Sequence, residues 1–362
     1  MTTLSAVRPS GVQIAPWVPA GEILSASSVL GAAFSTIWVP DQMLSRNAHI
    51  LMSAIAAGRQ VGVASGVTIP LSRNPIDIAS AMATVAELVA PDCSVQMGVG
   101  TGGSLVSSMF SKRAVLDLLR ECIGLIRRLW AGEIVLLRDY PLLRDRLGWR
   151  EDAVAQLSFP VTKPIPILMA VGGPKTRDLA EEVADGMICT STYPAVSYTA
   201  LESGDHAIVG ELVALVRRRA AAGRPFRLLY GLNCCVSQDG EAAREFARRQ
   251  AAIVAGNPVL WPDLSRAGFD MDSCAKVRTA LRGGAPLAEA ARDVSDDLLD
   301  GLLISGTPEE CAERMKAVER TARSAGFGEF YLGAPLGPDI GEAARLLVEK
   351  VLPAVWPNDM WR

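Results

Sequence analysis

Histidine is scarce in this sequence, and the cysteines form no metal-binding pairs. The chain of 362 residues has two histidines, His49 and His206, and seven cysteines, none of them in a CxxC pair. Because zinc sites are built from clustered Cys and His ligands, no metal centre is expected. An odd number of scattered cysteines is typical of reduced thiols in a cytoplasmic protein.

The sequence also lacks an excess of charge of one sign and a long apolar run. Its net charge is −3, and no apolar run reaches the roughly 18 residues of a membrane-spanning helix. The first residues, MTTLSAVRPSG, lack the apolar core of a signal peptide. We therefore expect a cytoplasmic protein with a small-molecule substrate and with no nucleic-acid or membrane partner.

Short apolar segments alternate with longer amphipathic ones along nearly the whole chain. Each expected strand is followed by a helical segment, and the strands lie at residues 12–14, 36–39, 60–68, 94–99, 165–171, 187–190, 227–236 and 329–332. Eight such units favour an α/β fold of the (β/α)8 TIM-barrel type over an open doubly wound sheet. The pattern predicts one domain over residues 1–362, with insertions at about 132–162 and 256–300.

Candidate site residues follow the strands, because a barrel builds its active site from the loops at the carboxyl ends of its strands. Asp41 comes directly after the second strand, either as a helix N-cap or as a carboxylate near a ligand. Glycine-rich loops at residues 98–103 and 172–173 are typical of phosphate or cofactor binding, or of tight turns alone. Arg73 and Asn74 are equally compatible with loop structure and with phosphate contacts.

Six short motifs occur in order along the chain. They are residues 35–41 (STIWVPD), 65–75 (SGVTIPLSRNP), 97–102 (MGVGTG), 170–174 (AVGGP), 184–191 (ADGMICTS) and 305–310 (SGTPEE). Together they resemble the bacterial-luciferase-like superfamily of oxidoreductases. The pattern is most similar to two groups dependent on coenzyme F420, the methylenetetrahydromethanopterin reductases and the glucose-6-phosphate dehydrogenases.

The resemblance implies a luciferase-like barrel that binds coenzyme F420 in its mouth and forms a homodimer. Its reaction would be hydride transfer between the deazaflavin and a small organic substrate, reducing C=C, C=N or C=O or running in reverse. A non-prolyl cis peptide would fall at Gly66–Val67. The implied cofactor-binding residues are Asp41, Gly66, Val67, Gly98, Gly100, Thr101, Gly102, Ala170, Gly172, Gly173 and Thr190. The alternatives are an FMN-dependent monooxygenase of the same fold and a barrel that has lost catalysis.

The substrate half of the resemblance is weaker than the cofactor half. Where the dehydrogenases have a His after the strand-two Asp, this chain has Gln42, and an amide cannot act as a general base. Three further positions differ from the dehydrogenases. Gly103 stands where they have a Glu, Arg46 stands where they have a Trp, and Tyr193 stands where they have a Lys that binds the sugar phosphate. The candidate catalytic residues are therefore Asp41, Gln42 and Tyr193, with the proton coming from water or from Tyr193.

Overall fold

The computed structural model describes residues 9–102, 114–204 and 206–357. They belong to two compact units, one made of the chain up to Phe34 and from Ile188 onward, the other of Ser35–Met187. The boundary falls inside the strand β8 (Gly186–Thr190). The single domain over residues 1–362 stays a prediction.

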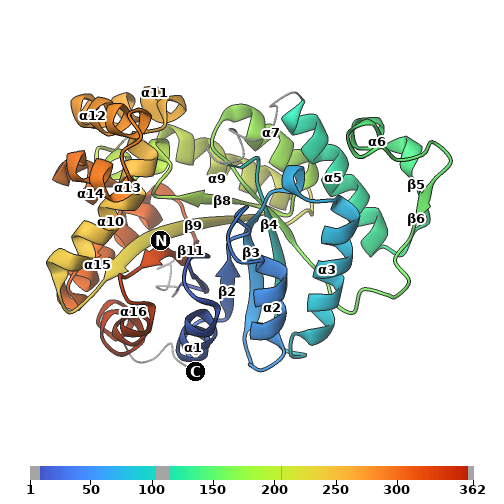
Figure 1. Cartoon of the computed structure of the whole chain (residues 1–362), viewed down its shortest axis with the longest axis horizontal. Helices are drawn as coiled ribbons and strands as arrows, with labels where there is room; N and C mark the ends of the chain where they lie inside the picture. Colours follow the sequence, from blue (N-terminus) through green and yellow to red (C-terminus); the bar gives the residue numbers. More distant parts are fainter. Residues whose placement is uncertain (1–8, 103–113, 205, 358–362) are drawn as a thin grey trace. The chain divides into compact units, whose positions relative to one another are not determined.

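Parallel strands form the sheet of the Ser35–Met187 unit. They pair in the order β2 (Thr36–Val39), β3 (Gly62–Thr68), β4 (Val95–Val99) and β7 (Ile167–Ala170). The helices that follow them are α2 (Ala48–Ala56), α3 (Pro75–Leu88), α5 (Val115–Trp130) and α7 (Pro174–Val183). Helices α2, α3 and α5 lie next to one another along this sheet (Figure 1). Residues 36–39 are all buried, as expected for a parallel strand covered by helices.

The first insertion is attached to α5. It contains β5 (Val135–Leu136), η2 (Leu137–Asp139), α6 (Pro141–Leu147) and β6 (Val154–Ala155), with β5 and β6 antiparallel. The Glu121 carboxylate of α5 accepts hydrogen bonds from the backbone N–H groups of Leu142 (3.2 Å) and Leu143 (2.9 Å). These bonds hold the start of α6 beside α5, at the edge of the unit drawn in green in Figure 1.

In the other unit, β9 (Arg227–Val236) is the central strand. It is parallel to β10 (Ile304–Gly306) and β11 (Glu329–Leu336) and also pairs with β8, while β11 pairs with β1 (Gly11–Gln13). The three-residue β10 is the one strand here that the apolar pattern does not predict, because it is too short to show alternation. The surrounding helices are α1 (Ala20–Gly31), η3 (Pro194–Val196), α8 (Tyr198–Glu202), α9 (Ala207–Ala221), α15 (Pro308–Ala325), α16 (Ile340–Leu346), the π-helical η6 (Leu347–Val351) and α17 (Leu352–Val355).

The second insertion is helical. It comprises η4 (Pro258–Leu260), α11 (Trp261–Arg266), α12 (Met271–Arg282), α13 (Leu287–Ala290), η5 (Ala291–Asp293) and α14 (Asp296–Leu302). Of these, α12, α13 and α14 pack on α10 (Gly240–Ala255), whose alanines Ala243, Ala247 and Ala251 are fully buried against side chains such as Val277 and Leu298. The small side chains of α10 let the insertion approach closely and form a core of its own.

In residues 9–102, 114–204 and 206–357, no helix is long and apolar enough to cross a membrane. Within the same ranges, no three His, Cys, Asp or Glu side chains come together in a way that could hold a metal ion.

Candidate functional site

Asp41 is buried and paired with Arg73. It follows β2, and only 2% of its side chain is exposed. Arg73 donates from Nε to Oδ2 at 2.7 Å and from Nη2 to Oδ1 at 2.6 Å, so each carboxylate oxygen accepts one charged hydrogen bond. This two-bonded geometry fixes both planar groups in one orientation.

The helix-cap interpretation of Asp41 is wrong. Helix α2 is capped by Asn47, whose Oδ1 accepts from the backbone N–H groups of His49 (3.0 Å) and Ile50 (3.3 Å). The role of Asn74, in the loop before α3, also follows from a helix cap. Asn74 caps α3 by accepting from the Ile76 N–H at 3.0 Å, which confirms its loop-structure interpretation.

His49 is a site residue that the sequence analysis did not select. It is the second residue of α2, is 9% exposed, and its Nε2 has no hydrogen-bond partner among residues 9–102, 114–204 and 206–357. Burial lowers the pKa of His49; the Asp41 carboxylate raises it and the Arg73 guanidinium lowers it. Its place directly after a strand-two loop, in a chain with two histidines, is the one signal that could have selected it.

The lowered pKa of His49 predicts a loss of stability in acid that a His49→Met variant should not share. Below about pH 6.5 the unfolded chain takes up this proton before the folded protein does, so acidification favours unfolding. Methionine fills the site without a titrating nitrogen. Between about pH 8 and about pH 5.5, the urea midpoint of the variant should therefore fall less than that of the parent.

His206→Gln is the matched control, because the His206 Nε2 already bonds to the Leu201 carbonyl at 2.9 Å. It should keep the acid sensitivity that comes from His49. Equal pH dependence in the parent and in His49→Met would show that His49 is not a buried neutral group.

The ends of β3, β4 and β7 form a close backbone cradle. The cis peptide Gly66–Val67 is present, as the resemblance implies. A Cβ on Gly98 would lie 2.3 Å from the Ser65 carbonyl oxygen, and one on Gly100 would lie 3.0 Å from Val67 Cγ2 and 3.6 Å from the Ala170 Cβ. The structure thus brings together five residues predicted to bind the cofactor: Gly66, Val67, Gly98, Gly100 and Ala170.

The cradle opens toward accessible space. Gly66 and Val67 are partly exposed in a strand that is otherwise buried, and Ala170, Thr101 and Gly102 are partly exposed as well. Gly102 has φ +85°, a left-handed conformation that favours glycine. Gly103 lies outside the described residues, so this loop is characterised only up to Gly102.

The second glycine loop has internal hydrogen bonds. The N–H groups of Gly172 and Gly173 both donate to Thr176 Oγ1 at 3.2 Å, and that hydroxyl donates to the Gly173 carbonyl at 2.7 Å. An anion at these N–H groups would have to share them with Thr176. No heavy atom lies within 4 Å of a Cβ built on Gly173, so this loop does not enclose its glycine as the first loop does.

In the other unit, Thr190 belongs to a hydrogen-bond network centred on Asn233. Thr190 Oγ1 donates to Asn233 Oδ1, which also accepts from Ser191 Oγ at 3.1 Å, and Asn233 Nδ2 donates to the Ala334 carbonyl at 2.8 Å. Burial raises the pKa of Tyr331 beside Thr190, so its phenol stays protonated. The network fixes the Thr190 hydroxyl at the end of β8.

The two remaining catalytic candidates lie in loops. Gln42 is exposed in the loop between β2 and α2. Tyr193 precedes η3, and its backbone N–H donates to the Thr190 carbonyl at 2.9 Å. The catalytic roles of Gln42 and Tyr193 stay predictions.

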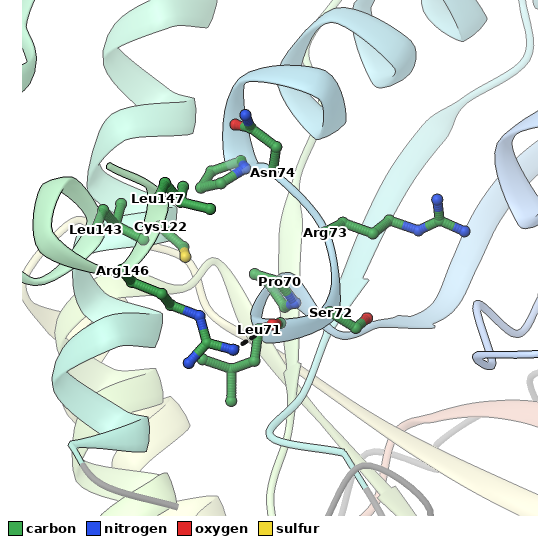
Figure 2. A pocket seen from close by; sticks show the side chains of 10 residues that line it. Pro70, Leu71, Ser72, Arg73, Asn74, Cys122, Leu143, Arg146 and Leu147 are labelled. Carbon is green, nitrogen blue, oxygen red and sulfur yellow. Dashed lines mark hydrogen bonds between the residues drawn. The ribbon is translucent and has the colours of Figure 1, made fainter. Parts of the chain in front are cut away.

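A cavity of about 500 Å³ lies between η1 (Pro70–Ser72), α5 and α6. Its lining includes Pro70, Leu71, Arg73, Cys122, Leu143 and Arg146. Arg146 donates to the Leu71 carbonyl at 2.8 Å, whereas the Arg73 side chain extends away from α5 and α6 (Figure 2). Cys122 is a poor nucleophile, since burial raises its pKa to about 12. The first insertion thus shapes a cavity, and Arg73 presents its guanidinium on the other side.

Comparison with known proteins identifies the family. A 5,10-methylenetetrahydromethanopterin reductase of Archaeoglobus fulgidus is 26% identical over 332 residues, covering 89% of this chain and 92% of that protein. An F420-dependent glucose-6-phosphate dehydrogenase of Amycolatopsis mediterranei is 32% identical, covering 45% of this chain and 51% of its own.

Among solved structures, the coenzyme F420-dependent tetrahydromethanopterin reductase of Methanopyrus kandleri superposes with a TM-score of 0.74 at 19% identity, covering 96% of this chain and 99% of its own. The likeness in fold confirms the (β/α)8 barrel predicted from the sequence. The model of the luciferase-like monooxygenase family matches residues 31–325. This chain therefore belongs to the luciferase-like monooxygenase family.

Proposed function

We propose that this chain is a coenzyme F420-dependent oxidoreductase that transfers hydride between the deazaflavin and a small organic substrate. The cradle of Gly66, Val67, Gly98, Gly100 and Ala170 carries the proposal, because Gly66, Val67 and Ala170 are partly exposed there. The buried Gly98 and Gly100 have no room for larger side chains, so the strands that carry the cradle lie close together. A flat ring system needs this kind of close backbone approach. F420 dependence is named for two of the similar proteins above.

The residues present fit such a cofactor. Gly66, Val67 and Ala170 would lie against the ring, and Thr101, Gly102, Gly172, Gly173 and Thr190 would hold the remainder. Bound deazaflavin would supply the hydride, so the protein supplies binding, orientation and electrostatics.

Asp41 is poorly suited to be a general base. Both of its oxygens accept bonds from Arg73, and its side chain is 2% exposed. The proton that accompanies hydride transfer would therefore be exchanged by water or by Tyr193. Reduction of an enone, imine or carbonyl is compatible with such a site, because the proton that it takes up can come from water or from Tyr193 and no strong base is needed.

The experiment is a tryptophan-fluorescence titration of the purified protein with F420 and, in parallel, with FMN. Trp38 is a natural reporter, since its ring lies 3.2 Å from the position of a Cβ on Gly98. We expect F420 to bind in the micromolar range or tighter, with FMN much weaker. A Trp38→Phe variant should lose most of the signal change and retain affinity measured by equilibrium dialysis.

The alternative function is an FMN-dependent monooxygenase, which the family description favours. It predicts the opposite cofactor preference and oxygen consumption with reduced FMN. A barrel without catalysis predicts that neither cofactor binds. The small-molecule substrate, the cytoplasmic location and the homodimer stay predictions, and subunit mass in solution would test the last of them.

A further inference from the structure

The Asp41–Arg73 pair is asymmetric in its burial. The exposed fraction of the Asp41 side chain is 2% and that of Arg73 is 30%. The carboxylate is therefore hidden behind the guanidinium, and the group that a ligand meets at this position is a cation. Asp41 acts as the anchor of Arg73 rather than as a ligand contact.

Arg73 has unused hydrogen-bond donors. A guanidinium carries five N–H groups in a planar fork. Arg73 uses Nε and one N–H of Nη2 on Asp41, and it donates to no other residue in the described ranges 9–102, 114–204 and 206–357. Both N–H groups of Nη1 and the second one of Nη2 remain, on the edge of the fork away from the carboxylate.

This free edge is held in place and lies at the catalytic end of the barrel. Asp41 follows β2, and Arg73 lies between η1 and α3 in the loop after β3, so both belong to loops at the carboxyl ends of strands. In a barrel these loops build the active site. A guanidinium already fixed by two bonds loses little freedom when it binds a second planar group.

We propose that Arg73 is a specificity-determining residue that receives an oxyanion of the substrate, so that the substrate class is a small molecule bearing a carboxylate. The proposal rests on the proposed hydride-transfer function. Asp41 positions Arg73 and neutralises its charge, so the free edge of Arg73 is the positive end of an ion pair with no net charge. A carboxylate matches this edge with two parallel N–H···O bonds.

The test compares carboxylates with their neutral amides as probes. Binding of acetate against acetamide, and of benzoate against benzamide, is measured by calorimetry on the protein without cofactor and again with F420. At least one carboxylate should bind about tenfold or more tightly than its amide, because hydrogen bonds to a charged group are the strong ones. If the parent protein does not bind F420, the proposed function is refuted. The comparison of carboxylates with amides on the protein without cofactor still tests Arg73.

Three variants locate the preference. Arg73→Lys keeps the positive charge without the planar fork of donors. It should reduce the ratio of carboxylate to amide affinity several-fold. Asp41→Asn/Arg73→Gln leaves a neutral, hydrogen-bonding pair in place of the ion pair and should bring the ratio close to one. Arg146→Gln is the matched control, because Arg146 lines the cavity on the other side and bonds to Leu71; it should leave the ratio unchanged.

Either of two results would overturn the proposal: no carboxylate binds more tightly than its amide to the parent protein, or the double variant keeps the parent's ratio of carboxylate to amide affinity. The first result could also come together with a tenfold loss of F420 affinity in Arg73→Lys. In that case the anion recognised by Arg73 belongs to the cofactor and not to the substrate.

Discussion

Replacing Arg73 with alanine should lower the free energy of unfolding by about 3–5 kcal/mol, the cost of leaving a buried charge without its partner. The Asp41 carboxylate is 2% exposed and accepts hydrogen bonds from Arg73 at 2.6 and 2.7 Å. With these bonds removed, the carboxylate must remain charged in a poorly solvated place or take up a proton. Both outcomes cost stability.

The opposite substitution should cost much less. In Asp41→Asn the amide keeps the shape of the carboxylate and one acceptor oxygen for Arg73. The guanidinium side chain is 30% exposed, so water can solvate part of its charge. We expect a loss of about 1–2 kcal/mol, typical of a weakened hydrogen bond to a charged group.

The double variant Asp41→Asn/Arg73→Ala separates the two causes. If the cost of Arg73→Ala comes from the abandoned carboxylate, then removing that charge as well should recover a large part of the lost stability. Urea unfolding at neutral pH, followed by circular dichroism, measures all four proteins. Equal losses in the two single variants, with simple additivity in the double, would show that the carboxylate is well solvated without Arg73.

The regular elements of this protein could be predicted from the sequence because their signals are local. The helix Pro308–Ala325 begins at Thr307, where Thr307 Oγ1 accepts from the Glu310 N–H and the Glu310 carboxylate accepts from the Thr307 N–H. Thr, Pro and Glu within four positions are enough to predict such a start. Pro75 at the first position of the helix Pro75–Leu88 is a local signal of the same kind.

Three helices of the second insertion could not be predicted because their sequence signals are short. Helices α11, α13 and α14 span 4–7 residues each, too few to show a helical period. Helices α13 and α14 pack on α10, which presents small side chains such as Ala247 and Ala251. Packing of this kind depends on the fold and not on local sequence.

Only part of the candidate site could be predicted, because some of its residues are close in sequence and others are brought together by the fold. The glycines of the cradle occur in contiguous motifs, so the structure could confirm that they come together. The Asp41–Arg73 ion pair joins residues 32 positions apart in the sequence. The burial of His49 depends on which face of α2 is turned toward the core. The sequence marked Asp41 and Arg73 separately, and only the fold shows that one neutralises the other.

Substitution of Gly98 by alanine should destabilise the cradle and weaken cofactor binding together. The new Cβ would lie 2.3 Å from the Ser65 carbonyl oxygen and 3.2 Å from Trp38 Cζ3. The Ser65 oxygen cannot move easily, because Ser65 pairs with Val39 on one side and with Met97 on the other. A clash with fixed backbone forces the strands apart, and we expect a loss of about 1–3 kcal/mol, the range for overpacked cores.

Gly173→Ala is the matched control for this prediction. Gly173 also belongs to a glycine-rich loop after a barrel strand, but a Cβ there meets no heavy atom within 4 Å. Its cost should be that of a poorer helix-cap residue, about 0.5–1 kcal/mol or less. Thermal unfolding and F420 titration on both variants separate two roles of these glycines. If only Gly98→Ala loses stability and cofactor affinity, then close backbone approach is the reason for a glycine at position 98. If both variants lose affinity with little loss of stability, then both loops bind the cofactor directly. In that second case, movement of β3 relieves the clash at Gly98.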